Sequence, residues 1–224
     1  MPLSFLVVNM NLTGISPVVF DVKILNDDGS KLAHLIPYCN EHQQRGEKLQ
    51  QACYLENPSA FLTTPVSQVF FTSMMELVKI QNIIKDRIID IHYKMGLADK
   101  YKIVVAFDAH QLPQAIGIFR LDREAIDGRK CIELYSIITA IWNINHPQHD
   151  NHPNRVKGAG SSIIEFCKKF AKENRAEYIY LEAALTAESF YKKHGFSRLS
   201  SGSVEGQGNE ATARQPMIFD LEKV

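Results

Sequence analysis

The sequence predicts an α/β (α+β) protein with a mostly antiparallel central sheet flanked by helices. Three apolar, β-branched segments separated only by turns, residues 102–107, 114–121 and 131–139, have the pattern of an antiparallel meander. Apolar side chains recur at steps of three and four over residues 77–91 and 163–171, which predicts an amphipathic helix on either side of the meander. A chain of 224 residues can bury about 70–75% of its unfolded surface, so its core can be self-sufficient.

The segments before the first amphipathic helix predict two strands and a helical region. Residues 3–8 and 18–25 are β-branched and apolar, and N-D-D-G at 26–29 is typical of a turn. Residues 32–55 have a mixed helical pattern, in which Pro37 predicts a break.

The elements after the second amphipathic helix are shorter. We expect a strand at 178–182, a short helix at 187–194 closed by Gly195, and a last strand at 217–221. Residues 200–216 are small and polar, which predicts a loop.

Bulk composition excludes several classes of function. The 25 basic and 25 acidic residues balance, so nothing predicts a nucleic-acid partner held by charge. No apolar run reaches the 18 or so residues that a membrane span needs, and the N-terminus lacks the basic region of a signal peptide. The four cysteines have no metal-binding spacing, and we expect Cys167 to be a buried thiol. These observations predict a soluble, cytoplasmic protein without a membrane partner.

A glycine-rich segment, R-V-K-G-A-G, stands at the start of the second amphipathic helix. Gly158 and Gly160 let the backbone approach a ligand closely and adopt positive φ. The helix that follows presents free N–H groups and the positive end of its dipole, which is a site for phosphate.

A second motif follows one predicted strand later and reads A-x-x-F-Y-x-K-x-G-F, with every fixed position filled between Ala187 and Phe196. Together the two motifs resemble the GNAT superfamily of N-acetyltransferases, whose R/Q-x-x-G-x-G/A loop grips the pyrophosphate of acetyl-CoA. The order of predicted elements is also similar to that family. The resemblance implies a mixed, mostly antiparallel sheet in an acyl-CoA N-acyltransferase fold. It implies one GNAT-like domain over 1–224, with its core at 65–221 and a family-atypical region at 1–64.

The resemblance also implies an activity and its residues. The protein would move an acetyl group directly from acetyl-CoA, its cosubstrate, to a primary amine of unknown identity, in a small molecule or a protein. Tyr191 would be the general acid, and Glu133 or a water the general base. Glu133 has an alternative as the ion-pair partner of Arg120 or Arg123. The residues implied to bind acetyl-CoA are Ile137, Ile138, Thr139, Arg155, Val156, Lys157, Gly158, Ala159, Gly160 and Ser161.

The sequence departs from the family pattern at two places. Residues 140–154 form an insertion before the glycine-rich loop, and Ala184 stands where the family often has an asparagine that touches the cofactor. The insertion carries His146, His149 and His152, which we interpret as solvated side chains because the segment lacks cysteine and regular structure; no metal is expected.

Two other readings remain open. Gly158, Gly160 and Glu182 have part of the spacing of a dinucleotide-binding unit, although Ile163 replaces the third glycine. A GNAT-like module that binds acyl-CoA or a protein partner without catalysis is the other alternative.

Overall fold

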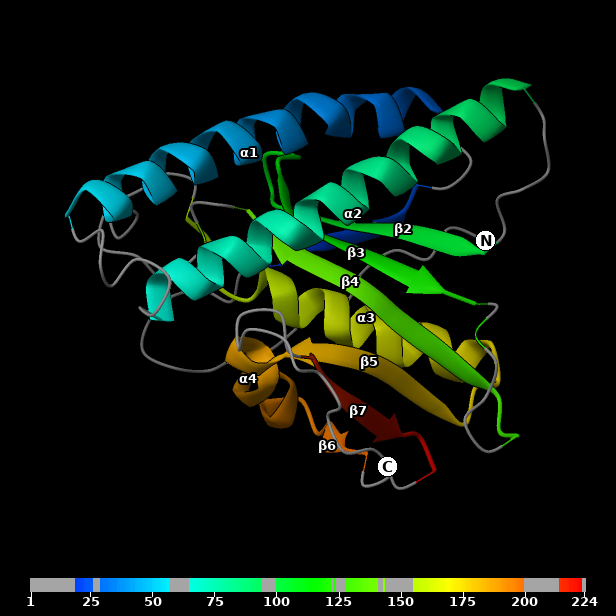
Figure 1. The fold of residues 1–224 in the computed structure, drawn as a ribbon. Coiled ribbons are helices and arrows are strands. Elements are labelled where there is room, and N and C mark those ends of the chain that lie inside the picture. Colours follow the sequence, from blue (N-terminus) through cyan, green and yellow to red (C-terminus); the bar gives the residue numbers. More distant parts are fainter. Residues whose placement is uncertain are drawn as a thin grey trace.

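The structure is a computed structural model that describes residues 19–25, 29–56, 65–93, 100–121, 123, 128–140, 143, 155–199 and 214–222. Within these ranges it has seven strands and four α-helices (Figure 1). In chain order the elements are β1 (Asp21–Ile24), α1 (Gly29–Glu56), α2 (Pro65–Tyr93), β2 (Tyr101–Phe107), β3 (Pro113–Arg120), β4 (Cys131–Thr139), α3 (Ala159–Glu173), β5 (Tyr178–Ala184), the 3-10 turn η3 (Leu185–Ala187), α4 (Glu188–Lys193), β6 (Ser197–Arg198) and β7 (Arg214–Asp220).

The strands form one sheet in the order β1-β2-β3-β4-β5-β7-β6. Every neighbouring pair is antiparallel except β4 and β5, which are parallel. Parallel neighbours need a crossover, and α3 lies in the connection between them. The predicted fold class, a mixed and mostly antiparallel sheet flanked by helices, is confirmed.

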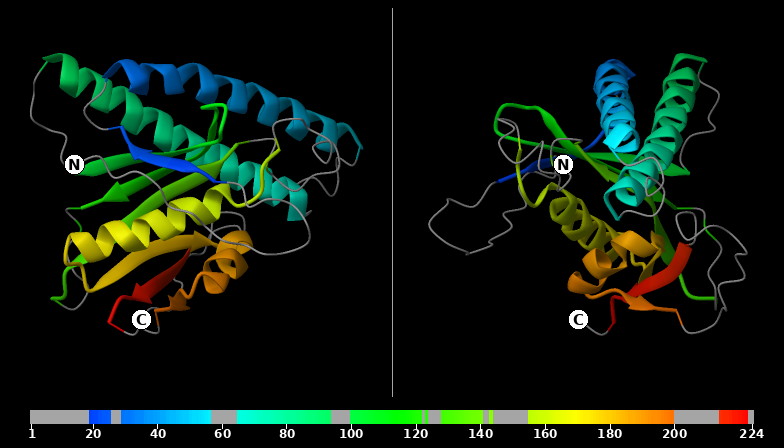
Figure 2. Two further views of the ribbon diagram at one scale, coloured as in Figure 1. Left: turned by 180° about the vertical axis from the view of Figure 1, so that it is seen from behind. Right: turned by 60° about the vertical axis from the view of Figure 1, so that its left-hand side comes forward.

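Helices cover both faces of the sheet. In Figures 1 and 2, α1 and α2 lie together on one face and α3 lies on the other. Successive side chains of a strand point to opposite faces, so Ile103 and Val105 of β2 join the core under α1 and α2, whereas Val104 and Ala106 join the core under α3. The stripe predicted on α3 is buried in that second core, with Ile163 fully buried.

The break predicted at Pro37 is wrong, because α1 continues through this residue. A proline inside a helix costs about 3 kcal/mol. Leu32, Leu35 and Cys39, on either side of it, are buried against the sheet. Burying a leucine contributes about 1.5–3 kcal/mol, so the packing of this helix outweighs its one missing hydrogen bond.

The start of α2 at Pro65 lies twelve residues before the predicted stripe at 77–91, and the other boundaries shift by a few residues. The predicted strand at 18–25 is β1, which pairs with β2, and the last strand begins at Arg214 instead of 217. The two-residue β6 was not predicted, since it is too short to show a pattern. The predicted strand at 3–8, most of the turn at 26–29 and most of the loop at 200–216 lie outside the described residues.

The N-terminal third takes part in the same sheet and core as the rest. Strand β1 and helix α1 both fall within the 1–64 region, and α1 packs on α2. The division into a 65–221 core and an N-terminal region stays a prediction. None of the helices in the described ranges is long and apolar enough to cross a membrane.

A β-bulge in β4 decides which way its polar side chains point. Ile118 of β3 lies opposite Ser136 and Phe119 lies opposite Leu134, so Tyr135 is an extra residue in β4. In a regular strand, residues two apart share a face. Because of the bulge, Leu134 packs on the α3 side while Ser136 contacts α2 on the opposite side.

Candidate functional site

A pocket of about 520 Å³ opens where β4 and β5 part. The two strands pair over only three residues each, from Cys131 to Glu133 and from Tyr178 to Tyr180, and then diverge toward α4 (Figure 1). The pocket is lined by α2, the end of β4, the start of α3 and the η3–α4 segment. The lining residues are Thr72, Ser73, Glu76, Ile137, Ile138, Thr139, Asn143, Val156, Lys157, Gly158, Ala159, Gly160, Ser161, Thr186, Ala187, Phe190 and Tyr191.

The glycine-rich loop forms one end of the pocket. Gly158 is the N-cap of α3 with φ of 96°, a left-handed conformation that favours glycine. The first intrahelical bond runs from Ser162 N–H to Gly158 O at 2.9 Å. The N–H groups of Ala159, Gly160 and Ser161 precede it and have no carbonyl in their own helix to bond. This end of the pocket is therefore suited to an anion.

Gly160 is required for a different reason. A side chain there would place its Cβ 3.3 Å from Thr139 and 3.5 Å from the Phe190 ring. The absence of a side chain lets α3 approach both β4 and α4 closely, which joins the two walls of the pocket.

A chain of buried and partly buried polar groups anchors the loop. The N–H of Val156 donates to Asn143 Oδ1 at 2.7 Å, and the Asn143 side-chain amide donates to Gln114 Oε1 at 2.9 Å. Gln114 is fully buried and donates in turn to Asp108 at 2.8 Å. Buried polar groups are costly unless paired, so this chain fixes the loop relative to β3. The sequence did not identify Asn143, which lies within the 140–154 insertion.

Tyr191 of α4 also lines the pocket. Its ring is buried between Phe190 and Phe196, with centroid separations of 5.2 and 5.8 Å. Burial raises the pKa of the Tyr191 phenol well above its usual range, and the nearby Glu76 carboxylate adds to the effect. The hydroxyl therefore keeps its proton at neutral pH and can donate it.

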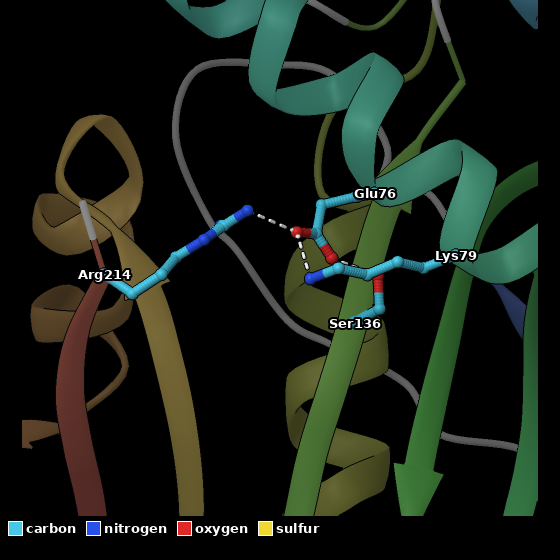
Figure 3. A network of polar contacts seen from close by, with 4 residues as sticks. All are labelled: Glu76, Lys79, Ser136 and Arg214. Atoms are coloured by element: carbon cyan, nitrogen blue, oxygen red, sulfur yellow. Dashed lines mark hydrogen bonds and ion pairs between the residues drawn. The ribbon is translucent and has the colours of Figure 1, made fainter. Parts of the chain in front are cut away.

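Glu76 of α2 also lines the pocket, and the sequence did not identify it. Figure 3 shows its carboxylate between three elements: it accepts from Ser136 of β4 at 2.5 Å, from Arg214 of β7 at 2.7 Å and from Lys79 of α2 at 3.1 Å. The sequence pattern could have identified this residue, because Glu76 lies four residues before Ile80 on the apolar stripe of α2. A carboxylate on a buried stripe has to find partners.

Glu133 lies away from the lining of this pocket. Its carboxylate is 2.6 Å from Arg123 and 3.5 Å from Arg120, which is the pairing weighed as the alternative to a base. Burial raises its pKa, while both arginines act in the opposite direction. Arg123 in turn stacks on the Tyr180 ring, 3.6 Å from its centroid. The base role of Glu133 stays a prediction.

The structure thus brings most of the predicted residues together. Ten of them line one pocket, namely Ile137, Ile138, Thr139, Val156, Lys157, Gly158, Ala159, Gly160, Ser161 and Tyr191, while Glu133 and Arg155 do not. In the part of the chain that the structure describes, no three His, Cys, Asp or Glu side chains gather as a metal site. His146, His149 and His152 lie outside that part.

Comparison with known proteins finds resemblance only among solved structures. No protein-family model and no curated protein sequence matches the chain. A nourseothricin acetyltransferase is 18% identical with a TM-score of 0.38, over 55% of this chain and 66% of that one, just under two thirds of its length. GCN5 of Tetrahymena is 14% identical with a TM-score of 0.49, over 90% and 96% of the two chains. The PaiA N-acetyltransferase of Thermoplasma acidophilum, solved with coenzyme A, is 13% identical with a TM-score of 0.47, over 89% and 98%.

All three are GNAT acetyltransferases. Their identities and TM-scores are low, so the function of this chain has to be inferred from its own pocket.

Proposed function

We propose that this protein is a GNAT-type N-acetyltransferase that moves an acetyl group from acetyl-CoA to a primary amine. The observation that carries the proposal is a single pocket that is lined both by an anion-binding loop and by a buried, protonated tyrosine. The two sequence motifs support it, since each fills the pattern of the family.

The pocket offers each part of acetyl-CoA a matching surface. The N–H groups at the start of α3 would hold the diphosphate. The edge of β4 from Ile137 to Thr139 is unpaired on its β5 side, so its backbone groups would bond the amides of the pantetheine arm. The thioester would then lie near Tyr191, which donates a proton to the departing CoA thiolate.

The amine would enter from the side of α2. An ionised carboxylate has about four acceptor positions, and donors in the described residues occupy three of those on Glu76. The remaining position is on Oε2, where it would hold an N–H of the amine. Glu133 or an ordered water stays our candidate base. Glu133 is held by Arg120 and Arg123 outside the lining of the pocket, so a water would have to relay the proton from the amine to it.

The sheet weighs against the dinucleotide-binding reading. That reading needs consecutive parallel βαβ units, and β4 and β5 are the one parallel pair among the described strands.

The test is release of free thiol from acetyl-CoA in the presence of a panel of amines, including amino acids, peptides with free N-termini, polyamines and aminoglycosides. We expect at least one class to accelerate thiol release well above hydrolysis. Tight CoA binding without transfer to any amine would favour the non-catalytic module instead.

A further inference from the structure

Three side chains that the proposed mechanism does not use form a chain at the anion-binding end of the pocket. Ser161 lies in the first turn of α3, and its Oγ is 3.0 Å from Nε2 of His194, the residue that ends α4. The Nδ1 of His194 is 3.4 Å from Oε1 of Glu165, one turn further along α3. Ser161 lines the pocket, whereas the other two stand behind it.

The protons in this chain can be assigned from the partners. The hydrogen bond from His194 lowers the pKa of Glu165 to about 2, with Lys168 contributing, so the carboxylate is ionised and only accepts. Nδ1 of His194 must then carry a proton. In the neutral ring Nε2 is bare, and it accepts the hydroxyl proton of Ser161.

With its hydroxyl proton directed at His194, Ser161 cannot donate a hydrogen bond to an anion in the pocket. A serine hydroxyl has one proton, and while that proton is directed at His194, the pocket sees only the lone pairs of Oγ. A phosphate oxygen placed there would be repelled. The conflict disappears if His194 takes up a second proton, because Nε2–H then donates to Oγ and the hydroxyl proton is free to donate to the phosphate.

We propose that His194, held by Glu165, is a positioning residue that turns the Ser161 hydroxyl toward the diphosphate of CoA by taking up a proton as the ligand binds. Of the charged groups near the ring, the Glu165 carboxylate favours the change and the Lys168 ammonium opposes it. Glu165 of α3 contacts the ring directly with Lys168 behind, and the face contributed by α4 is the uncharged Phe190 ring, 4.9 Å away. A bound diphosphate adds further negative charge. The inference rests on the proposed function, since it needs CoA in this pocket.

The order Ser–His–Glu is also that of a nucleophilic triad. The position of Ser161 favours a binding role, because it shares the first turn of α3 with the N–H groups of Ala159 and Gly160 at the anion-binding end. An acetyl group on Ser161, detected by mass spectrometry after exposure to acetyl-CoA, would overturn the proposal.

The experiment compares two ligands that differ in the diphosphate. Affinities for CoA and for S-acetylpantetheine, which lacks it, are measured for the wild type, His194→Asn and Ser161→Ala. Losing a hydrogen bond to a charged group should weaken CoA binding about 10- to 100-fold in each variant, with S-acetylpantetheine unaffected. The double variant should lose little more than either single one, because the two residues act as a unit.

Proton uptake separates positioning from a structural role. CoA titrations at about pH 8 are repeated in two buffers of different ionisation enthalpy. The wild type should take up a fraction of a proton on binding, and His194→Asn should not. His110→Asn, the same change in an exposed turn, is the control and should match the wild type in every measurement.

The outcomes distinguish this inference from the function beneath it. If the wild type binds no CoA, both the proposed function and this inference are wrong. If the wild type binds CoA and a folded His194→Asn binds it equally well, or still takes up the proton, the inference alone is wrong. Equal weakening for CoA and S-acetylpantetheine would likewise overturn it. Should His194→Asn fail to fold, Glu165→Gln gives the same comparison.

Discussion

Replacing Gly158 with alanine should expose the role of its left-handed backbone. An added Cβ would meet only the Phe20 ring, at an ordinary 3.7 Å, so the change acts through φ and causes no clash. An L-residue in this region costs about 1–2 kcal/mol, of which about 0.4–1 kcal/mol is offset by the smaller freedom of the unfolded chain.

The strain that Gly158→Ala introduces would be measured either as a loss of stability or as a loss of CoA affinity. If the loop keeps its conformation, we expect a net loss of about 1 kcal/mol of stability, which for a chain of this size lowers Tm by about 2–4 °C. If the free loop relaxes, the strain returns on binding and weakens CoA affinity by about 5- to 30-fold. Thermal melting and calorimetric titration with CoA together measure both.

The chain offers a matched control. Gly128 also has positive φ, 80°, with no neighbour within 4 Å of an added Cβ, and it does not line the pocket. Gly128→Ala should lower Tm by a similar amount and leave CoA affinity unchanged. The reasoning is refuted if Gly158→Ala changes neither quantity, or if Gly128→Ala weakens CoA binding equally.

Three further changes test the pocket and its support. Tyr191→Phe keeps the buried ring and removes its proton, so the rate of thiol release should fall by about 10² to 10⁴ with little change in CoA affinity; loss of affinity as well would assign Tyr191 to packing. Ile163 is fully buried and its Cγ2 lies 2.6 Å from where a Gly117 Cβ would be. Ile163→Ala should cost about 2–5 kcal/mol in urea unfolding, against less than about 0.5 kcal/mol for Ile89→Ala at a half-exposed position. Because the pKa of Glu165 is lowered from 4.5 to about 2, its contribution to stability is present at neutral pH and is lost as pH falls through that range. The stability difference between wild type and Glu165→Gln should vanish by about pH 2, and one that persisted there would contradict the assignment.

The fold followed from the sequence where its periodicity is strong. The strand at 131–139 matches β4 residue for residue, and the stripe through Ile163 and Cys167 is the buried face of α3. The prediction at Pro37 was wrong because local propensity does not contain the burial of Leu32 and Leu35 before it and of Cys39 after it. The bulge at Tyr135 leaves no mark in the sequence, since an extra residue is defined only by the partner strand.

Site residues that belong to contiguous motifs could be predicted from the sequence, whereas those brought together by tertiary packing could not. Gly158 and Tyr191 belong to contiguous motifs, which the resemblance to the GNAT superfamily assigned to one site, and both line the same pocket. Glu76 is brought to Ser136 and Arg214 by tertiary packing across 60 and 138 residues. The contact between Ser161 and His194 likewise depends on how α4 returns to α3.

The most direct test of the account is titration of the protein with CoA, followed by the same titration with NAD. If the glycine-rich loop and the pocket beside it form a CoA site, CoA at 100 times its dissociation constant should stabilise the protein by about 2.7 kcal/mol. That corresponds to a rise in Tm of about 5–10 °C, and NAD should give no comparable rise. An equal or larger rise with NAD, or none with CoA, would contradict the account.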